Sequence, residues 1–170
     1  MPNVEISPGL AGLNALEPEA AERELLACCA SRAFARAVAA LRPFPDLEGL
    51  GAAADSAVRE LAWPDVLEAL DAHPRIGERA AGAGRTASWS RQEQVGVQDR
   101  ARQALTEGNQ AYEARFGHVY LVCATGLSGE DLLARLRERL VNDDDTERRV
   151  VRDELAKITR LRLAKLVSAR

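Results

Sequence analysis

A histidine followed by proline, in the segment His73-Pro74-Arg75-Ile76-Gly77, has the clearest potential for chemistry in this sequence. The apolar residues before it recur at helical spacing, and a proline disfavours the helical conformation of the residue that precedes it. The sequence therefore predicts that a helix ends at or near His73. The negative end of a helix dipole favours a protonated imidazole, which is a suitable proton donor near neutral pH. The alternative is a histidine that only caps the helix.

A second candidate is the segment Ser90-Arg91-Gln92-Glu93-Gln94. A serine followed three residues later by glutamate is the capping-box pattern, so the sequence predicts a helix that begins at Ser90. An exposed helix N-terminus also binds anions, and a substrate carboxylate could bind the free amides there. The spacing alone favours the structural role, while Glu93 and Gln94 remain candidates for contact with a ligand.

Other kinds of site find little support in the sequence. The two histidines, His73 and His118, lie far apart, and no zinc-ligand spacing is present. The pair Gly82 and Gly84 does not follow a strand, so it is not a dinucleotide fingerprint. Cys28 and Cys29 fall in an amphipathic helix, where thiols are usually buried and inert. We therefore expect neither a metal nor an organic cofactor.

Size and composition restrict the class of protein. A chain of 170 residues suits one domain, residues 1–170, with a sizeable core. The 23 basic and 26 acidic residues are mixed along the chain and give a net charge of −3, which argues against a nucleic-acid partner. The number of cysteines is odd, three, which argues against a disulfide framework. Neither a signal peptide nor a membrane-spanning run is evident. We expect a soluble cytoplasmic protein without a membrane partner.

Abundant Ala, Leu, Arg and Glu, with few β-branched residues, predict an all-α, single-domain bundle of about eight helices. Proline, serine and aspartate residues mark the helix starts. The predicted helices cover 18–29, 31–41, 46–61, 64–73, 90–105, 109–116, 128–140 and 143–166. Residues 77–87 are expected to form a glycine-rich loop, Gly108 to break a helix, and Gly117 to cap one. The run 119–124 is strand-like in composition but too short to distinguish from a buried helical turn.

The last helix is expected to present one apolar face. Its members are Val151, Leu155, Ile158, Leu161 and Leu166.

Three ordered motifs together resemble a known family. They are the His73–Gly77 segment, the Ser90–Gln94 segment, and Asn109-x-x-Tyr112-x-x-Arg115-Phe116-Gly117 leading into Tyr120–Ala124. This arrangement closely resembles the OHCU decarboxylase family, which decarboxylates 2-oxo-4-hydroxy-4-carboxy-5-ureidoimidazoline (OHCU) in urate catabolism. The resemblance extends to Asn142-Asp143-x-x-x-Glu147 and to Lys157-Ile158-x-x-Leu161-Arg162-Leu163.

The resemblance implies an all-helical, cofactor-free enzyme, usually a homodimer, that yields (S)-allantoin and carbon dioxide. The catalytic histidine of the family corresponds to His73, our candidate proton donor, and Glu93 is the second catalytic candidate. The implied substrate-binding positions are Pro74, Ser90, Arg91, Gln92, Glu93, Gln94, Tyr120, Leu121, Val122, Cys123 and Ala124.

One departure from the family pattern concerns position 127. Many bacterial relatives have Lys or Arg there, whereas this chain has Leu127, so an anion contact from this position is absent. Two alternatives stay open, the first of them because of Leu127. One is a decarboxylase that acts on a related ureido compound, and the other is a non-catalytic helical module that binds a protein partner.

Overall fold

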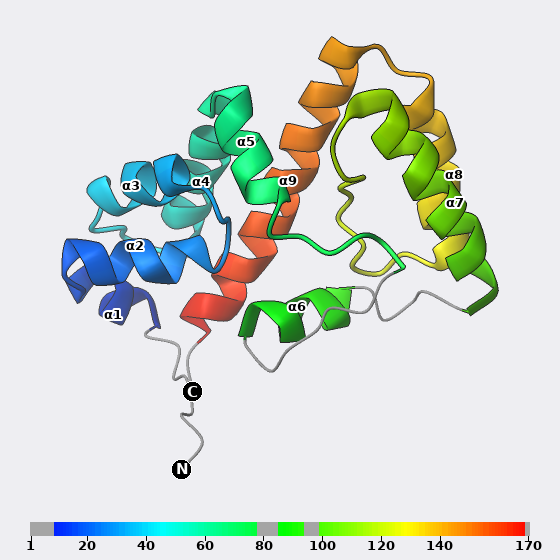
Figure 1. Cartoon of the computed structure of the whole chain (residues 1–170). Helices are drawn as coiled ribbons and strands as arrows, with labels where there is room; N and C mark the ends of the chain where they lie inside the picture. Colours follow the sequence, from blue (N-terminus) through cyan, green and yellow to red (C-terminus); the bar gives the residue numbers. More distant parts are fainter. Residues whose placement is uncertain (1–8, 78–84, 94–98, 169–170) are drawn as a thin grey trace. The chain divides into compact units, whose positions relative to one another are not determined.

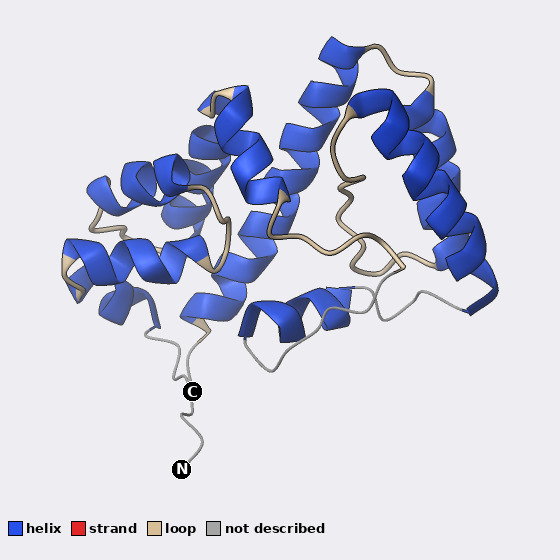
Figure 2. Cartoon of the chain, in the orientation of Figure 1, coloured by secondary structure: helices blue, strands red, loops and turns tan. Residues whose placement is uncertain are grey.

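The structure is a computed structural model that describes residues 9–77, 85–93 and 99–168, with the side chains of 99 and 100 left out. These residues contain nine α-helices and no strand, which confirms the all-α prediction for the part described (Figures 1 and 2). Among the same residues, no helix has both the length and the apolar character needed to cross a bilayer. The helices are α1 (Gly9–Ala15), α2 (Pro18–Leu26), α3 (Arg32–Ala40), α4 (Leu47–Glu60), α5 (Trp63–Leu70), α6 (Arg85–Glu93), α7 (Asp99–Phe116), α8 (Gly129–Leu140) and α9 (Asp144–Val167).

The helices belong to two compact units. The first comprises Met1–Ala69 and Ala156–Arg170, and in it α2 packs on α3 and α3 on α4. Leu25, Phe34 and Leu50 are fully buried in this unit. Helix α1 was not among the helices predicted. Its end is tied to the chain beyond α3, because Asn14 donates from Nδ2 to the Phe44 carbonyl and accepts from the Phe44 amide, both at 2.9 Å.

The second unit, Leu70–Leu155, contains all the candidate site residues that the structure describes. Its core is formed around α7 and α8, which run side by side (Figure 1). The buried members of this core are Ile76, Ala101, Leu105, Tyr112, Tyr120, Val122, Ala124, Leu132 and Leu136. This core thus includes residues from two of the three motifs that carry the family resemblance.

Several helix boundaries follow the sequence signals. Ser31 and Asp46 cap α3 and α4 as predicted, each accepting a backbone N–H with its side chain. Ser128 and Asp131 form the full capping box of α8. Gly117 ends α7 with φ of +82°, a conformation that glycine adopts without steric cost. On the predicted apolar face of α9, however, Leu161 is 40% exposed.

Helix α5 ends earlier than expected. Its last residue is Leu70, and His73 lies in the turn that follows, with its amide donating to the Leu70 carbonyl at 3.0 Å. Pro64 is the second residue of α5, because the helix begins at Trp63. The proline at position 74 therefore follows the turn and not the helix itself. His73 is close to the carbonyl end of α5 but beyond its last turn.

The prediction that a helix begins at Ser90 is wrong. Helix α6 begins at Arg85 and its last described residue is Glu93, so Ser90 lies inside a helix and cannot cap it. The expected loop is wrong for residues 85–87, whereas 78–84 lie outside the described residues. A capping-box pattern also occurs within helices, because serine and glutamate three positions apart then simply share one face.

The expected helix break at Gly108 is also wrong, since α7 continues through it to Phe116. A Cβ at position 108 would lie 3.0 Å from Leu136 Cδ2, closer than side chains normally pack. The absence of a side chain thus allows α7 and α8 to approach closely. A glycine inside a helix costs about 1 kcal/mol relative to alanine, and the close packing of α7 on α8 offsets this cost.

Replacing Ser128 by alanine is expected to destabilise the protein by about 1 kcal/mol, the usual cost of removing an N-cap hydroxyl. The Ser128 hydroxyl accepts from the Asp131 amide at 3.1 Å, and alanine leaves that amide without its partner. Urea unfolding would measure the change. Ser56→Ala, inside α4 and exposed, is the matched control and should be neutral or slightly stabilising. Equal effects of the two substitutions would contradict the capping assignment.

Candidate active site

The turn that carries His73 and Pro74 is fixed to α7 by polar contacts. Asn109 donates from Nδ2 to the Ile76 carbonyl at 2.8 Å, and Arg75 pairs with Glu113 at 2.9 Å, one turn further along α7. Ile76 is buried in the core of the second unit, while His73 and Pro74 are half-buried. The imidazole therefore lies on a turn that is fixed to α7 just after Pro74, and it remains partly accessible.

The side chain of Asn109 also carries a buried acceptor atom. It is only 3% exposed, and its Oδ1 has no hydrogen-bond partner in the described structure. Buried polar atoms are normally paired, so such an acceptor calls for an explanation. It lies on the side chain that holds the turn after His73.

The second motif lies on α6, near its end. Ser90 and Glu93 are buried, at 3% and 9% exposed, whereas Arg91 is half-buried and Gln92 is exposed. Gln94 lies outside the described residues. Ser90 and Glu93 are three positions apart and thus share one face of the helix. Capping does not account for this pair, because neither residue stands at a helix start.

The third segment, Tyr120–Ala124, forms neither a strand nor a helical turn but irregular backbone (Figure 2). All of it is buried except Cys123, which is half-buried. The amide N–H groups of Leu121, Val122 and Ala124 donate no hydrogen bond within the described structure. More than 90% of buried backbone groups in native proteins are paired. Unpaired amides in a buried, irregular segment are a backbone arrangement suited to binding a polar ligand.

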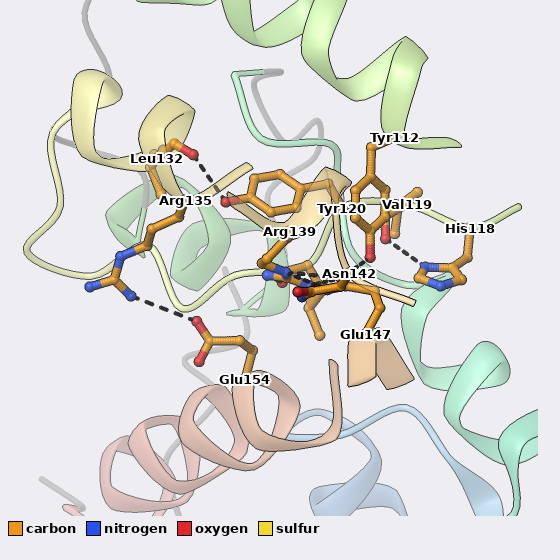
Figure 3. Close-up of polar contacts among 11 residues, drawn as sticks. Tyr112, His118, Val119, Tyr120, Leu132, Arg135, Arg139, Asn142, Glu147 and Glu154 are labelled. Atoms are coloured by element: carbon orange, nitrogen blue, oxygen red, sulfur yellow. Dashed lines mark hydrogen bonds and ion pairs between the residues drawn. The ribbon is translucent and has the colours of Figure 1, made fainter. Parts of the chain in front are cut away.

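A buried polar cluster contacts this segment through the Leu121 carbonyl (Figure 3). Arg139 on α8 is 6% exposed and donates from Nη2 to Glu147 Oε2 at 2.7 Å and from Nε at 2.9 Å. Its Nη1 donates to the Leu121 carbonyl at 2.5 Å. Glu147, at the start of α9, is fully buried and also accepts from the Tyr112 hydroxyl and from Asn142 Nδ2. Every charged group in this cluster is thus paired.

The electrostatics of the cluster keep Arg139 charged and Tyr112 neutral. Burial by itself would lower the pKa of the Arg139 guanidinium, but the hydrogen bonds and charge of Glu147 outweigh it and raise that pKa. Burial, and then the hydrogen bond to Glu147, raise the pKa of the Tyr112 phenol well above its ordinary value. The guanidinium also lies over the Tyr120 ring, with Cζ 4.8 Å from the ring centre. The segment therefore has a permanent positive charge next to its backbone.

The shared core joins the first and third motifs, since Ile76 lies in the same cluster as Tyr120, Val122 and Ala124. Ser90 and Glu93 belong to the same compact unit. Their approach to His73 is part of the proposal made below. The structure thus joins two of the three predicted segments through packing and shows the third as a buried pair on its own helix.

Removing the Tyr112 hydroxyl is expected to cost more stability than removing that of Tyr120. The first donates to the buried carboxylate of Glu147, and the second to the neutral Leu132 carbonyl at 3.0 Å. A hydrogen bond to a charged group contributes about 2 kcal/mol, against about 1 kcal/mol for a neutral pair. Urea unfolding of Tyr112→Phe and Tyr120→Phe measures both in the same core. The reverse order would contradict the assigned charge on Glu147.

Sequence reasoning did not identify Arg139 as part of the site. The charged residues Arg135, Arg137 and Arg139 follow one another on α8, and nothing in their spacing shows that only the last is buried. Asn109, Tyr112 and Glu147 did appear in the motifs that carried the resemblance. Their contacts with the turn and with Arg139 require the three-dimensional structure.

The chain is similar to several known proteins. The family model of OHCU decarboxylase matches residues 14–164. Over 156 residues the chain is 33% identical to "Uric acid degradation bifunctional protein TTL" of Arabidopsis thaliana, and the match covers 88% of this chain and 48% of that protein. It is 31% identical over 140 residues to 2-oxo-4-hydroxy-4-carboxy-5-ureidoimidazoline decarboxylase of Amia calva, with 78% of this chain and 79% of that protein covered.

A solved structure is also similar. It is a crystal structure of OHCU decarboxylase in the presence of (S)-allantoin, with a TM-score of 0.74 and 30% identity. The match covers 90% of this chain and 99% of that one. With the family model spanning most of the sequence and the fold shared as well, the chain belongs to the OHCU decarboxylase family.

Proposed function

We propose that this protein decarboxylates 2-oxo-4-hydroxy-4-carboxy-5-ureidoimidazoline to (S)-allantoin and carbon dioxide, as part of urate catabolism. Membership of the family supports the reaction class. The observation that carries the proposal within the structure is the buried segment Tyr120–Ala124. Its unpaired amides share a core with the turn that bears His73. A ligand rich in carbonyl and N–H groups, such as a ureidoimidazoline, would pair with such backbone.

In the proposed reaction, the bond between the ring carbon and the carboxylate breaks and carbon dioxide leaves. The electron pair passes into the adjacent imine and carbonyl system of the ring. His73 then gives a proton to the same carbon from one face, which sets the configuration of the product. The partly buried turn, fixed by Asn109 and Arg75, holds the imidazole in one position for this transfer.

Glu93 is proposed to orient the hydroxyl or ureido group of the substrate. Its burial on α6, three residues after Ser90, is consistent with a carboxylate that acts on a ligand and not on bulk water. Pro74, Arg91, Gln92 and Gln94 complete the proposed binding positions from the first two motifs. Leu127 offers no positive charge, so recognition of the substrate carboxylate does not come from that position.

Activity is expected to need no metal and no organic cofactor, because the substrate itself accepts the electrons that decarboxylation releases. Turnover should be unchanged after treatment with EDTA and on addition of NAD, flavin or thiamine diphosphate. The measurement is the rate of allantoin formation by the purified protein. Loss of activity with EDTA, restored by one specific divalent ion, would contradict this expectation.

The test of the function itself uses freshly generated substrate and follows the circular dichroism of the allantoin that forms. An (S)-specific signal at a rate above the uncatalysed one supports the proposal. Racemic product at the uncatalysed rate would overturn it and favour a non-catalytic binding module. A parallel assay with related carboxylated ureido compounds would establish which substrate is preferred.

We also propose a homodimer in the cytoplasm, on the basis of the family resemblance. Analytical ultracentrifugation at several protein concentrations tests the oligomeric state. A single monomeric species at all concentrations would contradict the homodimer. Fractionation of cells that express the protein tests its location.

A further inference from the structure

Arg139 combines burial with a hydrogen bond to the main chain. It is a buried cation, and its Nη1 donates a hydrogen bond to the backbone carbonyl of Leu121. A buried ion pair alone is weak evidence for a stabilising role, because apolar residues of similar volume often serve as well. The contact with Leu121 is therefore the part that needs explanation.

The contacts of the guanidinium fix its direction. Nε and Nη2 are both held by Glu147, and the carboxylate of Glu147 is itself held by Tyr112 and Asn142 (Figure 3). With two of its nitrogens bound in this way, the planar group has no freedom to rotate. Its remaining arm, Nη1, stays directed at the Leu121 carbonyl.

A charge-assisted hydrogen bond polarises the peptide group that accepts it. The carbonyl of Leu121 and the N–H of Val122 belong to one peptide unit, and in a trans peptide they point in opposite directions. Electron density drawn toward the carbonyl oxygen makes the N–H a stronger donor. The Val122 N–H has no hydrogen-bond partner among the residues that the structure describes.

We propose that Arg139 is a positioning residue that fixes and polarises the Leu121–Val122 peptide, so that the Val122 N–H binds a ligand oxygen bearing negative charge. The oxygen is of the carboxylate or enolate type, on which charge is present or develops as carbon dioxide leaves. This inference rests on the proposed function, which supplies the ligand. It gives a role to Arg139 on α8, which does not contact the ligand itself and acts on it through the Leu121–Val122 peptide.

The test compares Arg139→Lys with the wild-type protein. Lysine keeps the positive charge beside Glu147 but cannot hold that carboxylate and the Leu121 carbonyl at once in the fork geometry of arginine. We expect kcat/KM to fall by about tenfold or more, which is less than the loss of a preorganised donor itself, because the Val122 N–H is still present. The affinity for (S)-allantoin should fall by less, because the developing charge is absent from the product. The Val122 amide proton should also shift upfield in NMR spectra, as its donor strength falls.

The matched control is Arg135→Lys, the same substitution one turn earlier on α8, where Arg135 is within 4.0 Å of Glu154. It should leave both kcat/KM and the Val122 resonance unchanged. Should Arg139→Lys fail to fold, the double variant Arg139→Met with Glu147→Gln removes the buried charges together and keeps a polar partner for Tyr112. The same losses are expected of it.

The outcomes separate this inference from the proposed function. A wild-type protein without decarboxylase activity overturns the proposed function, and an (S)-allantoin titration that leaves the Val122 resonance unmoved then overturns the inference too. An active wild-type protein, combined with a folded Arg139→Lys that keeps kcat/KM within twofold, overturns the inference alone. A lowered melting temperature with unaltered kinetics would have the same meaning, since it would assign Arg139 a purely structural role.

Discussion

His73→Asn is expected to retain the fold and lose stereospecific formation of allantoin, with turnover reduced by about a thousandfold or more, within the range expected for a group that delivers the proton. Asparagine can occupy a turn and form hydrogen bonds, but it cannot donate a proton at neutral pH. The turn should survive because its main contacts come from its neighbours. Arg75 and the Ile76 carbonyl remain bound to α7 in the variant.

The measurement is the circular dichroism of the product, with total substrate loss followed in parallel. His118→Asn is the matched control, because it removes the second histidine of the chain, whose Nδ1 lies 3.0 Å from the Val119 carbonyl. This control should retain most of its turnover. Retention of even a tenth of wild-type activity by His73→Asn would show that another group delivers the proton.

The position of His73 also illustrates what local sequence can and cannot establish. Pro74 was enough to predict a helix end nearby, but α5 ends three residues before His73. The imidazole is therefore farther from the end of α5 than expected. Because the effect of a helix dipole declines within the last turn, the dipole of α5 acts less on His73 than the sequence predicted. The fixed position of the turn depends instead on Asn109 and Glu113, both more than thirty residues away in sequence.

Ser128 and Ser90 show why the same local pattern predicts one helix start and not another. Both serines are followed three residues later by an acid. Ser128 comes two residues after Gly126, whose φ of +78° is incompatible with a continuing helix. Helix α8 therefore begins at the serine cap. Ser90 follows Arg85–Trp89, residues that extend the helix upstream. The pattern is informative only where something ends the helix before it.

The buried cluster was beyond prediction for a different reason. An arginine on an amphipathic helix is normally a solvated side chain, and Arg135 and Arg137, with 139, form an unremarkable charged series. Burial of Arg139 becomes favourable only because Glu147, from the next helix, supplies a paired charge. The burial of Arg139 thus depends on an interaction between two helices, which the hydrophobic periodicity of a single helix cannot predict.

Glu93→Gln is expected to lower turnover by about a hundredfold or more, the scale for loss of a positioned acid-base or electrostatic group. Glutamine has nearly the same shape and a similar helix propensity, so the free energy of unfolding should change by less than about 1 kcal/mol. Helix capping plays no part in this expectation, because Glu93 is the last described residue of α6 and not near its start. The proposed contact of Glu93 with the substrate is what makes its negative charge matter for the rate.

Melting temperature and turnover should be measured together on Glu93→Gln and on Glu138→Gln, the same change at an exposed position of α8. The control should alter neither quantity. A large fall in rate at constant stability would separate the chemical role of Glu93 from a structural one. A fully active and equally stable Glu93→Gln would remove the carboxylate from the mechanism. Because glutamine keeps the hydrogen-bonding shape and loses only the charge, that result would confine the proposed chemistry to His73 and the backbone of Tyr120–Ala124.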